Sequence, residues 1–213
     1  MKHLVIIGVG GFAREVYWHA QESLGYGKEW DLKGFLDGDV KLEEGEYNKL
    51  ALPVLGDVRS YEIVKDDIFF CAIGNSLVRK KLVDGILSRG AEFISLIHNT
   101  AIVQGYVSYG TGVLFGPRTC VGDHAGIGDF VILNTASAVG HDAQIDDYVS
   151  IMSYVDITGY CHLEEGVMFG SGARILPNGR VGAYATVGAG SVVLRKVKPG
   201  ITVFGNPAVP IAK

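Results

Sequence analysis

The chain has 213 residues, a formal net charge of −4 at neutral pH, and 48% hydrophobic and 20% charged residues. This balance is ordinary for a globular protein, and the lack of a basic run argues against a nucleic-acid partner. No apolar stretch reaches the roughly eighteen residues of a membrane span, and MKHLVIIGVGG lacks the long apolar run and cleavage site of a signal peptide, so we expect a cytoplasmic protein.

The cysteines are Cys71, Cys120 and Cys161, an odd number without metal-ligand pairing. Cys71 lies in an apolar stretch, and Cys161 occupies a small, inward position of the repeat described below. We therefore expect reduced thiols in the core.

Residues 1–96 are expected to alternate between strands and helices. The apolar runs LVIIG, KGFLD, DIFFCAI and FISLI have the length and residue types of strands, and a further short strand is expected near residues 53–55. Helices are expected at residues 11–24 and 77–89. This alternation predicts a parallel sheet, so the segment is expected to be a small α/β domain, about half of a Rossmann-like fold.

The segment GVGGFARE joins the first strand to the first helix. Glycines at such a junction let backbone N–H groups approach a phosphate, and Gly8, Gly10 and Gly11 supply them. The GxGxxA spacing that starts at Gly8 fits a relaxed dinucleotide fingerprint, and Asp37 closes the next strand where a ribose-binding acid is expected. Half a sheet suits one nucleotide better than two. The alternative is a glycine turn that only packs the helix on the strand.

A second strand-to-helix junction is CAIGNSLVRKK. Two such turns at one edge of a parallel sheet face the same crevice, so Gly74 or Asn75 is expected to contact a nucleotide or sugar. The basic residues Arg79, Lys80 and Lys81 are interpreted as a solvated helix face.

From residue 97 to residue 193 a bulky apolar or aromatic residue recurs at every sixth position, seventeen times without an insertion. A hexapeptide period is the signature of a parallel β-helix, in which three hexads complete a coil and residues n and n+18 stack about 4.8 Å apart. The large residues are expected to fill the interior, and the glycine that often follows one is interpreted as suited to a tight bend. The tail KPGITVFGNPAVPIAK is expected to close the open end of the column. The large positions are Ile97, Val103, Tyr109, Phe115, Val121, Ile127, Leu133, Val139, Ile145, Ile151, Ile157, Leu163, Phe169, Ile175, Val181, Val187 and Val193.

Two His-Asp pairs occupy polar parts of neighbouring coils. His141 and Asp142 follow the inward Val139, and an imidazole beside a carboxylate can act as a general base. His124 is expected directly beneath Asp142, and Asp123 beneath His141, because each lies eighteen residues earlier. The residue pattern does not choose between the two histidines, and a solvated surface pair is the alternative.

The combined pattern resembles the PglD/NeuD group of bacterial sugar acyltransferases over essentially the whole chain. The motifs that carry the resemblance are the glycine turn, FLD, AIGN followed by RKK, LIH, then LNT and HD within the hexads, and GNPA near the end. The resemblance implies a Rossmann-like nucleotide-sugar-binding domain at residues 1–96 and a left-handed β-helix acyltransferase domain with a C-terminal cap at residues 97–213. It further implies a homotrimer that binds acetyl-CoA in a groove between subunits, a nucleotide-linked sugar as the second substrate, and no metal.

The resemblance also implies roles for single residues. His141 matches the family's base, Asp142 the acid that supports it, and Gly159 a glycine whose N–H lies near the thioester carbonyl. Ser150 stands where the family has a histidine in the coenzyme groove. The sequence departs from the family pattern at Phe12, often a histidine, and at Gly38, often an acid. Sugar-nucleotide contacts are implied for Gly8, Gly10, Asp37 and Gly74.

The expected activity is acetyl-CoA-dependent N-acetylation of a nucleotide-linked sugar in bacterial surface-glycan biosynthesis. Neutral His141 would take a proton from the sugar amine during direct transfer. Sugar O-acetylation of the sialic-acid type is the alternative, followed by a non-catalytic trimer that binds a nucleotide sugar or NAD. A zinc-dependent hydratase on the same fold would need three converging histidines, and beyond the first hexad the repeats hold only His124, His141 and His162.

Overall fold

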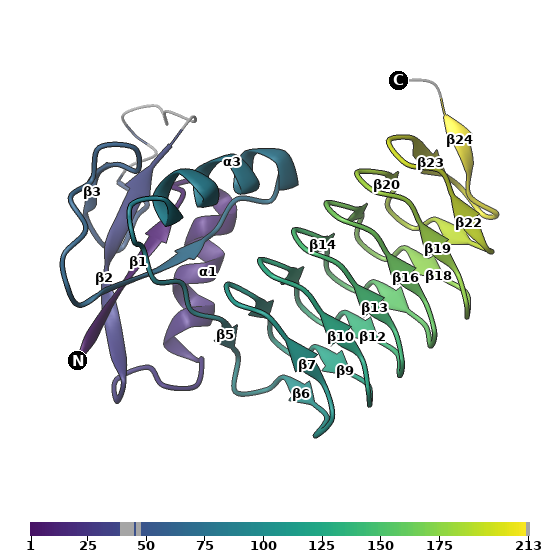
Figure 1. The fold of residues 1–213 in the computed structure, drawn as a ribbon, viewed down its shortest axis with the longest axis horizontal. Coiled ribbons are helices and arrows are strands. Elements are labelled where there is room, and N and C mark those ends of the chain that lie inside the picture. The colour runs from purple at the N-terminus through teal and green to yellow at the C-terminus, as the bar shows by residue number, and fades with distance from the viewer. Residues whose placement is uncertain (39–44, 46–47, 212–213) are drawn as a thin grey trace. The chain divides into compact units, whose positions relative to one another are not determined.

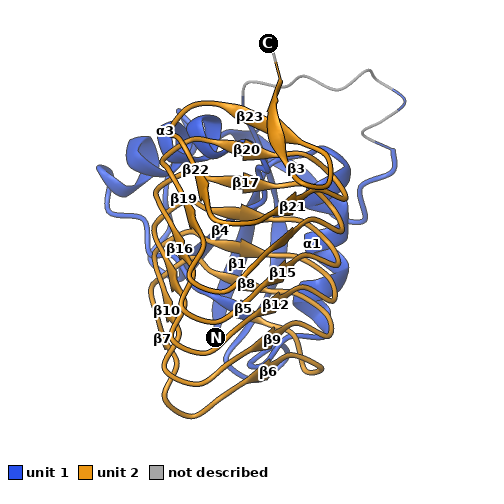
Figure 2. Cartoon of the chain, turned by 90° about the vertical axis from the view of Figure 1, so that its right-hand side faces the viewer, with its two compact units in different colours: residues 1–96 blue, residues 97–213 orange. Residues whose placement is uncertain are grey.

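A computed structural model describes residues 1–38, 45 and 48–211. The chain divides into two compact units, residues 1–96 and 97–213, and the division falls at the residue where the hexads begin (Figure 2).

The first unit contains a parallel sheet with strand order β3-β2-β1-β4 (Figure 1). Helix α1 follows β1, and helix α3 follows β4. Both helices stop earlier than expected, and the buried residues of the sheet include all of β4. The bounds are β1 Lys2–Ile7, α1 Gly11–Gln21, β2 Trp30–Asp37, β3 Val54–Asp57, β4 Asp67–Cys71 and α3 Ser76–Leu87. The expected parallel α/β arrangement is confirmed.

The second unit is a parallel β-helix, as expected, whose successive coils run from teal through green to yellow in Figure 1. Its strands form three sheets. One contains β5 Leu96–Ile97, β8 Leu114–Phe115, β11 Ile132–Leu133, β14 Ser150–Ile151, β17 Met168–Phe169, β20 Thr186–Val187, β23 Thr202–Phe204 and β24 Val209–Ile211. The second contains β6 Ile102–Val103, β9 Cys120–Val121, β12 Ala138–Val139, β15 Asp156–Ile157, β18 Arg174–Ile175 and β21 Val192–Val193. The third contains β7 Ser108–Tyr109, β10 Gly126–Ile127, β13 Gln144–Ile145, β16 His162–Leu163, β19 Arg180–Val181 and β22 Lys196–Val197.

The stacking of residues eighteen apart is confirmed: Val139 pairs with Val121 on one side and Ile157 on the other. Every large position from Phe115 to Val193 is buried. The prediction is wrong at Tyr109, which is 46% exposed. Tyr109 lies on β7, the last strand of its sheet, so a neighbouring strand covers it on one side only.

The tight-bend interpretation of the glycines that follow large residues is wrong. Gly122 and Gly140 do not have positive φ. Instead, a Cβ at Gly122 would lie 2.7 Å from the backbone nitrogen of His141, and a Cβ at Gly140 would lie 2.5 Å from the backbone nitrogen of Gly159. These glycines are therefore required because the next coil passes so close. The left-handed positions come two residues later and carry large side chains at His124, Phe130, Tyr148, Tyr154, Tyr160 and Tyr184.

The C-terminal segment closes the column. Strand β23 continues the first sheet in parallel with β20, and β24 turns back antiparallel to β23. An antiparallel hairpin ends the run of parallel coils, so the GNPA motif lies in the turn of this cap.

Candidate functional site

Both strand-to-helix turns of the first unit open onto one cavity of about 280 Å³. It lies beyond the carboxyl ends of β1, β2 and β4, where open α/β sheets bind their ligands. All six residues predicted to contact the sugar nucleotide line it, together with Phe12 and Gly38: Gly8, Gly10, Gly11, Asp37, Gly74 and Asn75. The structure therefore brings together two motifs that are far apart in the sequence.

The glycines of these turns have different reasons to be glycine. Gly8 has φ +120°, and a Cβ there would lie 3.0 Å from the Ala72 carbonyl oxygen, so the fold itself requires it. A Cβ at Gly10 or Gly74 would meet no atom of the described residues within 4 Å. Packing does not require glycine at these two positions. Because glycine has no side chain, a ligand in the cavity can come close to the backbone there.

The polar side chains at the cavity already make local bonds. The Asn75 Oδ1 accepts the Val78 N–H at 3.1 Å and caps α3. The Asp37 Oδ1 accepts the Gly38 N–H at 2.7 Å. These bonds fix the orientation of both side chains at the cavity wall; their contact with a ligand stays a prediction.

The interpretation of Arg79 as a solvated residue is wrong. Arg79 is 1% exposed, and its Nη1 donates to the carbonyl oxygens of Ile73 at 2.6 Å and Gly74 at 3.2 Å. It shares the buried face of α3 with Leu82, Val83 and Ile86, at the spacings i+3, i+4 and i+7. That spacing was visible in the sequence and indicates an inward position.

In the second unit, His141 lies at the corner between β12 and β13. Its Nδ1 is 2.8 Å from Asp142 Oδ2, and both side chains are partly exposed. The Tyr160 ring and the imidazole pack at right angles, with 5.0 Å between ring centroids and an interplanar angle of 89°. A carboxylate beside Nδ1 accepts a hydrogen bond from the N–H there. This keeps the proton of the neutral imidazole on Nδ1 and leaves the lone pair on Nε2 for base catalysis.

Gly159 also lies against this imidazole, on the next coil. A Cβ at Gly159 would be 2.8 Å from both Cε1 and Nε2 of His141, so only glycine leaves room for the ring. No acceptor for the Gly159 N–H is found among the residues that the structure describes. A bare N–H beside a general base is the arrangement that an oxyanion site requires.

The second His-Asp pair has the same distance between Nδ1 and the carboxylate, with the order of the two residues reversed. His124 Nδ1 lies 2.8 Å from Asp123 Oδ2, and the ring stacks on Tyr106 with 5.1 Å between centroids. The Asp142 N–H donates to the Asp123 carbonyl at 3.0 Å, so the two pairs lie on adjacent coils as predicted. Of these two histidines, only His141 packs against a glycine whose N–H has no acceptor among the described residues. This difference favours His141 as the base.

Known proteins match the first unit of this chain and also the chain as a whole. Residues 3–86 match the family model of the PglD N-terminal domain. The chain is 37% identical over 146 residues to GDP-perosamine N-acetyltransferase of Escherichia coli O157:H7, an alignment that covers 66% of this chain and 66% of that protein. The acetyltransferase domain of PglB from Neisseria gonorrhoeae, solved with acetyl coenzyme A, is similar with a TM-score of 0.85 and 29% identity over 99% of both chains.

PerB from Caulobacter crescentus, solved with CoA and GDP-perosamine, gives a TM-score of 0.87 at 28% identity and covers 100% of this chain and 98% of its own. The chain belongs to the PglD/NeuD-like family of acetyltransferases. The recognition made from the motifs is confirmed, and these relatives agree with the expectation of an acyltransferase that uses acetyl-CoA.

Within this PglD/NeuD-like protein, Ser150 differs in its setting from the other predicted site residues. It begins β14 and is fully buried, whereas the side chain of His141 is 60% exposed. Because Ser150 is buried, its setting gives no support to a coenzyme contact, and that contact stays a prediction from the resemblance alone.

The thiols and histidines do not suggest other chemistry. Burial raises the pKa of Cys71 to about 12, with the Arg79 charge opposing the shift, and Cys161 is buried as well. His162 lies 3.1 Å from Asp146, so His124, His141 and His162 each lie next to an acid of their own. The described residues contain no group of three His, Cys, Asp or Glu side chains that could hold a metal ion. None of the helices that the structure describes is long and apolar enough to cross a membrane.

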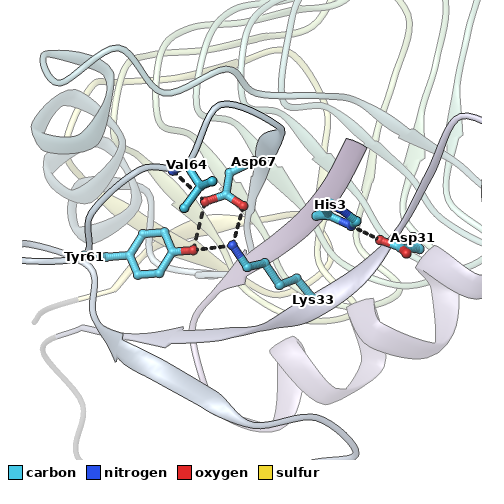
Figure 3. Close-up of polar contacts among 6 residues, drawn as sticks. All are labelled: His3, Asp31, Lys33, Tyr61, Val64 and Asp67. Atoms are coloured by element: carbon cyan, nitrogen blue, oxygen red, sulfur yellow. Dashed lines mark hydrogen bonds and ion pairs between the residues drawn. The ribbon is translucent and has the colours of Figure 1, made fainter. Parts of the chain in front are cut away.

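A polar network that the sequence did not indicate joins Lys33 of β2, Tyr61 and the first residue of β4, Asp67 (Figure 3). Lys33 Nζ donates to Asp67 Oδ1 at 2.6 Å and to the Tyr61 hydroxyl at 2.8 Å. The Tyr61 hydroxyl and the Val64 N–H both donate to Asp67 Oδ2, at 2.8 and 3.0 Å. Asp67 begins β4, at the amino end of the strand and away from the cavity, so the network is structural.

Proposed function

We propose that this protein transfers an acetyl group from acetyl-CoA to the amino group of a nucleotide-linked sugar, as a homotrimer in bacterial surface-glycan biosynthesis. The observation that carries the proposal is the His141 imidazole, bonded to Asp142 at Nδ1 and packed against Gly159. The cavity at the two glycine turns supports a nucleotide-bound substrate. The GDP-perosamine N-acetyltransferase relative supports a sugar amine as the acceptor.

The chemistry is direct acyl transfer. The amine attacks the thioester carbonyl while His141 Nε2 accepts the amine proton, a contribution of roughly 10²- to 10⁴-fold in rate. The carbonyl oxygen becomes an oxyanion and accepts the Gly159 N–H, an interaction worth about 3 kcal/mol when the donor is well aimed. The intermediate collapses by breaking the carbon–sulfur bond, and the imidazolium returns its proton to the departing CoA thiolate. The products are the N-acetyl sugar and CoA.

The nucleotide is assigned to the cavity of the first unit. The first N–H groups of α1 and α3 have no acceptors within their own helices, and helix N-termini attract phosphate. Gly10 and Gly74 let the phosphates come close to those groups. Asp37, at the end of β2, is the residue assigned to the ribose or the base.

The test is release of the CoA thiol from acetyl-CoA with a panel of UDP-, GDP- and CMP-linked sugars, each with and without a free amine. Wild type is compared with His141→Ala and with His124→Ala, a matched control because its Nδ1 also lies 2.8 Å from an aspartate oxygen. We expect amine-dependent release that falls by at least about 10²-fold in His141→Ala and little in His124→Ala.

Three other results would contradict parts of the proposal. Release that depends on a hydroxyl acceptor and yields an ester would establish O-acetylation instead. A loss confined to His124→Ala would move the base to the lower coil. Nucleotide binding without any turnover across the panel would favour the non-catalytic alternative.

A further inference from the structure

Arg79 is a charged side chain that the proposed reaction does not use, yet it is buried beside the nucleotide cavity. It lies in the first turn of α3 and is 1% exposed. Removing a guanidinium from water is costly unless hydrogen bonds compensate it. An apolar side chain could fill this position on the buried face of α3 without that cost, but it could not donate hydrogen bonds to the turn that precedes the helix.

The hydrogen bonds of Arg79 fix two successive peptide groups. Nη1 donates to the carbonyl of Ile73 at 2.6 Å and to the carbonyl of Gly74 at 3.2 Å. In a planar trans peptide the N–H points opposite to the C=O. Because both carbonyls face Arg79, the N–H groups of Gly74 and Asn75 face the other way.

The other side of this turn is the cavity. Ile73, Gly74 and Asn75 line it, while the Arg79 side chain is enclosed behind them. A Cβ at Gly74 would meet nothing within 4 Å, so a ligand can reach the backbone there. Successive backbone N–H groups aimed at one point form an anion-binding concavity.

We propose that Arg79 is a positioning residue that turns the Gly74 and Asn75 N–H groups toward the diphosphate of the nucleotide sugar. The inference rests on the proposed function, because it specifies how the same cavity recognises its substrate. Arg79 itself stays behind the turn and acts through the two carbonyls that it holds. Its effect is therefore on binding of the anionic part of the substrate and not on acyl transfer.

The experiment measures binding to the full-length protein by calorimetry, with GDP and UDP as diphosphate probes and guanosine and uridine as uncharged controls. Arg79→Met keeps the length of the side chain and removes its donors, and Arg79→Lys keeps the charge. We expect Arg79→Met to weaken diphosphate binding about tenfold or more, equivalent to about 1.4 kcal/mol, and nucleoside binding less than about twofold. Arg79→Lys should fall between. In turnover, KM for the nucleotide sugar should rise while kcat and the KM for acetyl-CoA stay unchanged.

A second pair of variants tests the amide directly without changing Arg79. Asn75 has φ −71°, a value that proline adopts, so Asn75→Pro removes the N–H with the backbone kept. Asn75→Ala removes the same helix cap and retains the N–H. Weaker diphosphate binding in the proline variant than in the alanine variant supports the proposal, even if Arg79→Met does not fold.

Equal losses for nucleosides and diphosphates in Arg79→Met, or equal binding by the two Asn75 variants, would overturn the inference and leave Arg79 a packing residue. If wild type binds neither the diphosphates nor the nucleosides, the assignment of the nucleotide to this cavity fails first, and the inference with it.

Discussion

His141 is positioned by features that belong to single residues of its corner. Asp142 Oδ2 accepts a hydrogen bond from Nδ1 at 2.8 Å, and Gly159 leaves the space that the ring occupies. The partner of Asp142 is its sequence neighbour, whereas Gly159 lies eighteen residues further on. The hexad register therefore builds the site, because it alone places residue 159 against residue 141.

Gly159→Ala should reduce activity without unfolding the protein. Its Cβ would lie 2.8 Å from two atoms of the His141 ring, so the ring must swing away from the position in which Asp142 holds it. We expect kcat to fall by about 10²-fold, the lower end of the contribution of a general base. The measurement is steady-state turnover together with thermal unfolding.

Gly105→Ala is the matched control, since Gly105 occupies the same position of the hexad and a Cβ there meets nothing within 4 Å. Equal activity in both alanine variants would show that the ring position does not matter for catalysis.

At the scale of elements, the sequence predicted where the strands and turns lie, but not why particular residues are required in them. The hexad period predicted the stacking of coils, because a repeat without insertions admits one register. It did not reveal that Gly122 and Gly140 are needed for close backbone approach, since that depends on the distance between coils and not on local geometry. Two glycine turns were likewise found as motifs, but the buried role of Arg79 required the helical face to be considered with the turn.

The Lys33–Asp67 network escaped prediction because its members come from separate elements. Lys33 lies on β2 and Asp67 on β4, and β1 lies between these strands in the sheet. A contact across an intervening strand leaves no spacing in the sequence that reveals it. The network joins the two strands and the segment that carries Tyr61, so we expect it to stabilise the first unit.

The pKa shifts in this network give a pH dependence. Burial raises the pKa of Asp67, but hydrogen bonds from Lys33, the Val64 N–H and Tyr61 outweigh burial and leave it below the ordinary 3.8. Its stabilisation is thus fully present above pH 3.8 and is lost as the pH falls through the lowered value. Burial lowers the pKa of Lys33, but bonds to Asp67 and Tyr61 raise it above 10.5, so its contribution is lost only as the pH rises through that raised value.

Lys33→Met should therefore destabilise the protein by about 2 kcal/mol near neutral pH, because it leaves the buried Asp67 carboxylate without its cation. Acid unfolding should also begin at a higher pH than in wild type. Urea unfolding followed across the pH range measures both effects. Asp31→Asn is the control: the His3–Asp31 pair is 2.5 Å long, close to the 2.6 Å between Lys33 and Asp67, but it is more exposed, so we expect little change. A similar loss in the two variants would refute the special contribution of the buried network.

At the scale of the whole molecule, the two units carry separate parts of the proposed reaction. The cavity for the nucleotide is lined entirely by residues of the first unit, and the His141 corner lies entirely in the second. Each contains its own buried core. A change in one ligand site should therefore alter one substrate's KM and leave the other unaffected.

Gly10→Leu tests this separation. Gly10 is the N-cap of α1 and lines the cavity, and a Cβ there meets no protein atom within 4 Å, so leucine can enter the cavity without distorting the fold. Since the side chain would occupy the space assigned to the nucleotide, we expect KM for the nucleotide sugar to rise at least about tenfold, the equivalent of 1.4 kcal/mol of lost binding. The KM for acetyl-CoA and the thermal midpoint should stay close to wild type. Gly85→Leu is the control, because Gly85 lies on α3, outside the cavity, where a Cβ also meets nothing within 4 Å. A rise in both KM values in Gly10→Leu would show that the two substrates are not bound independently, and an unchanged KM for the sugar would place the nucleotide elsewhere.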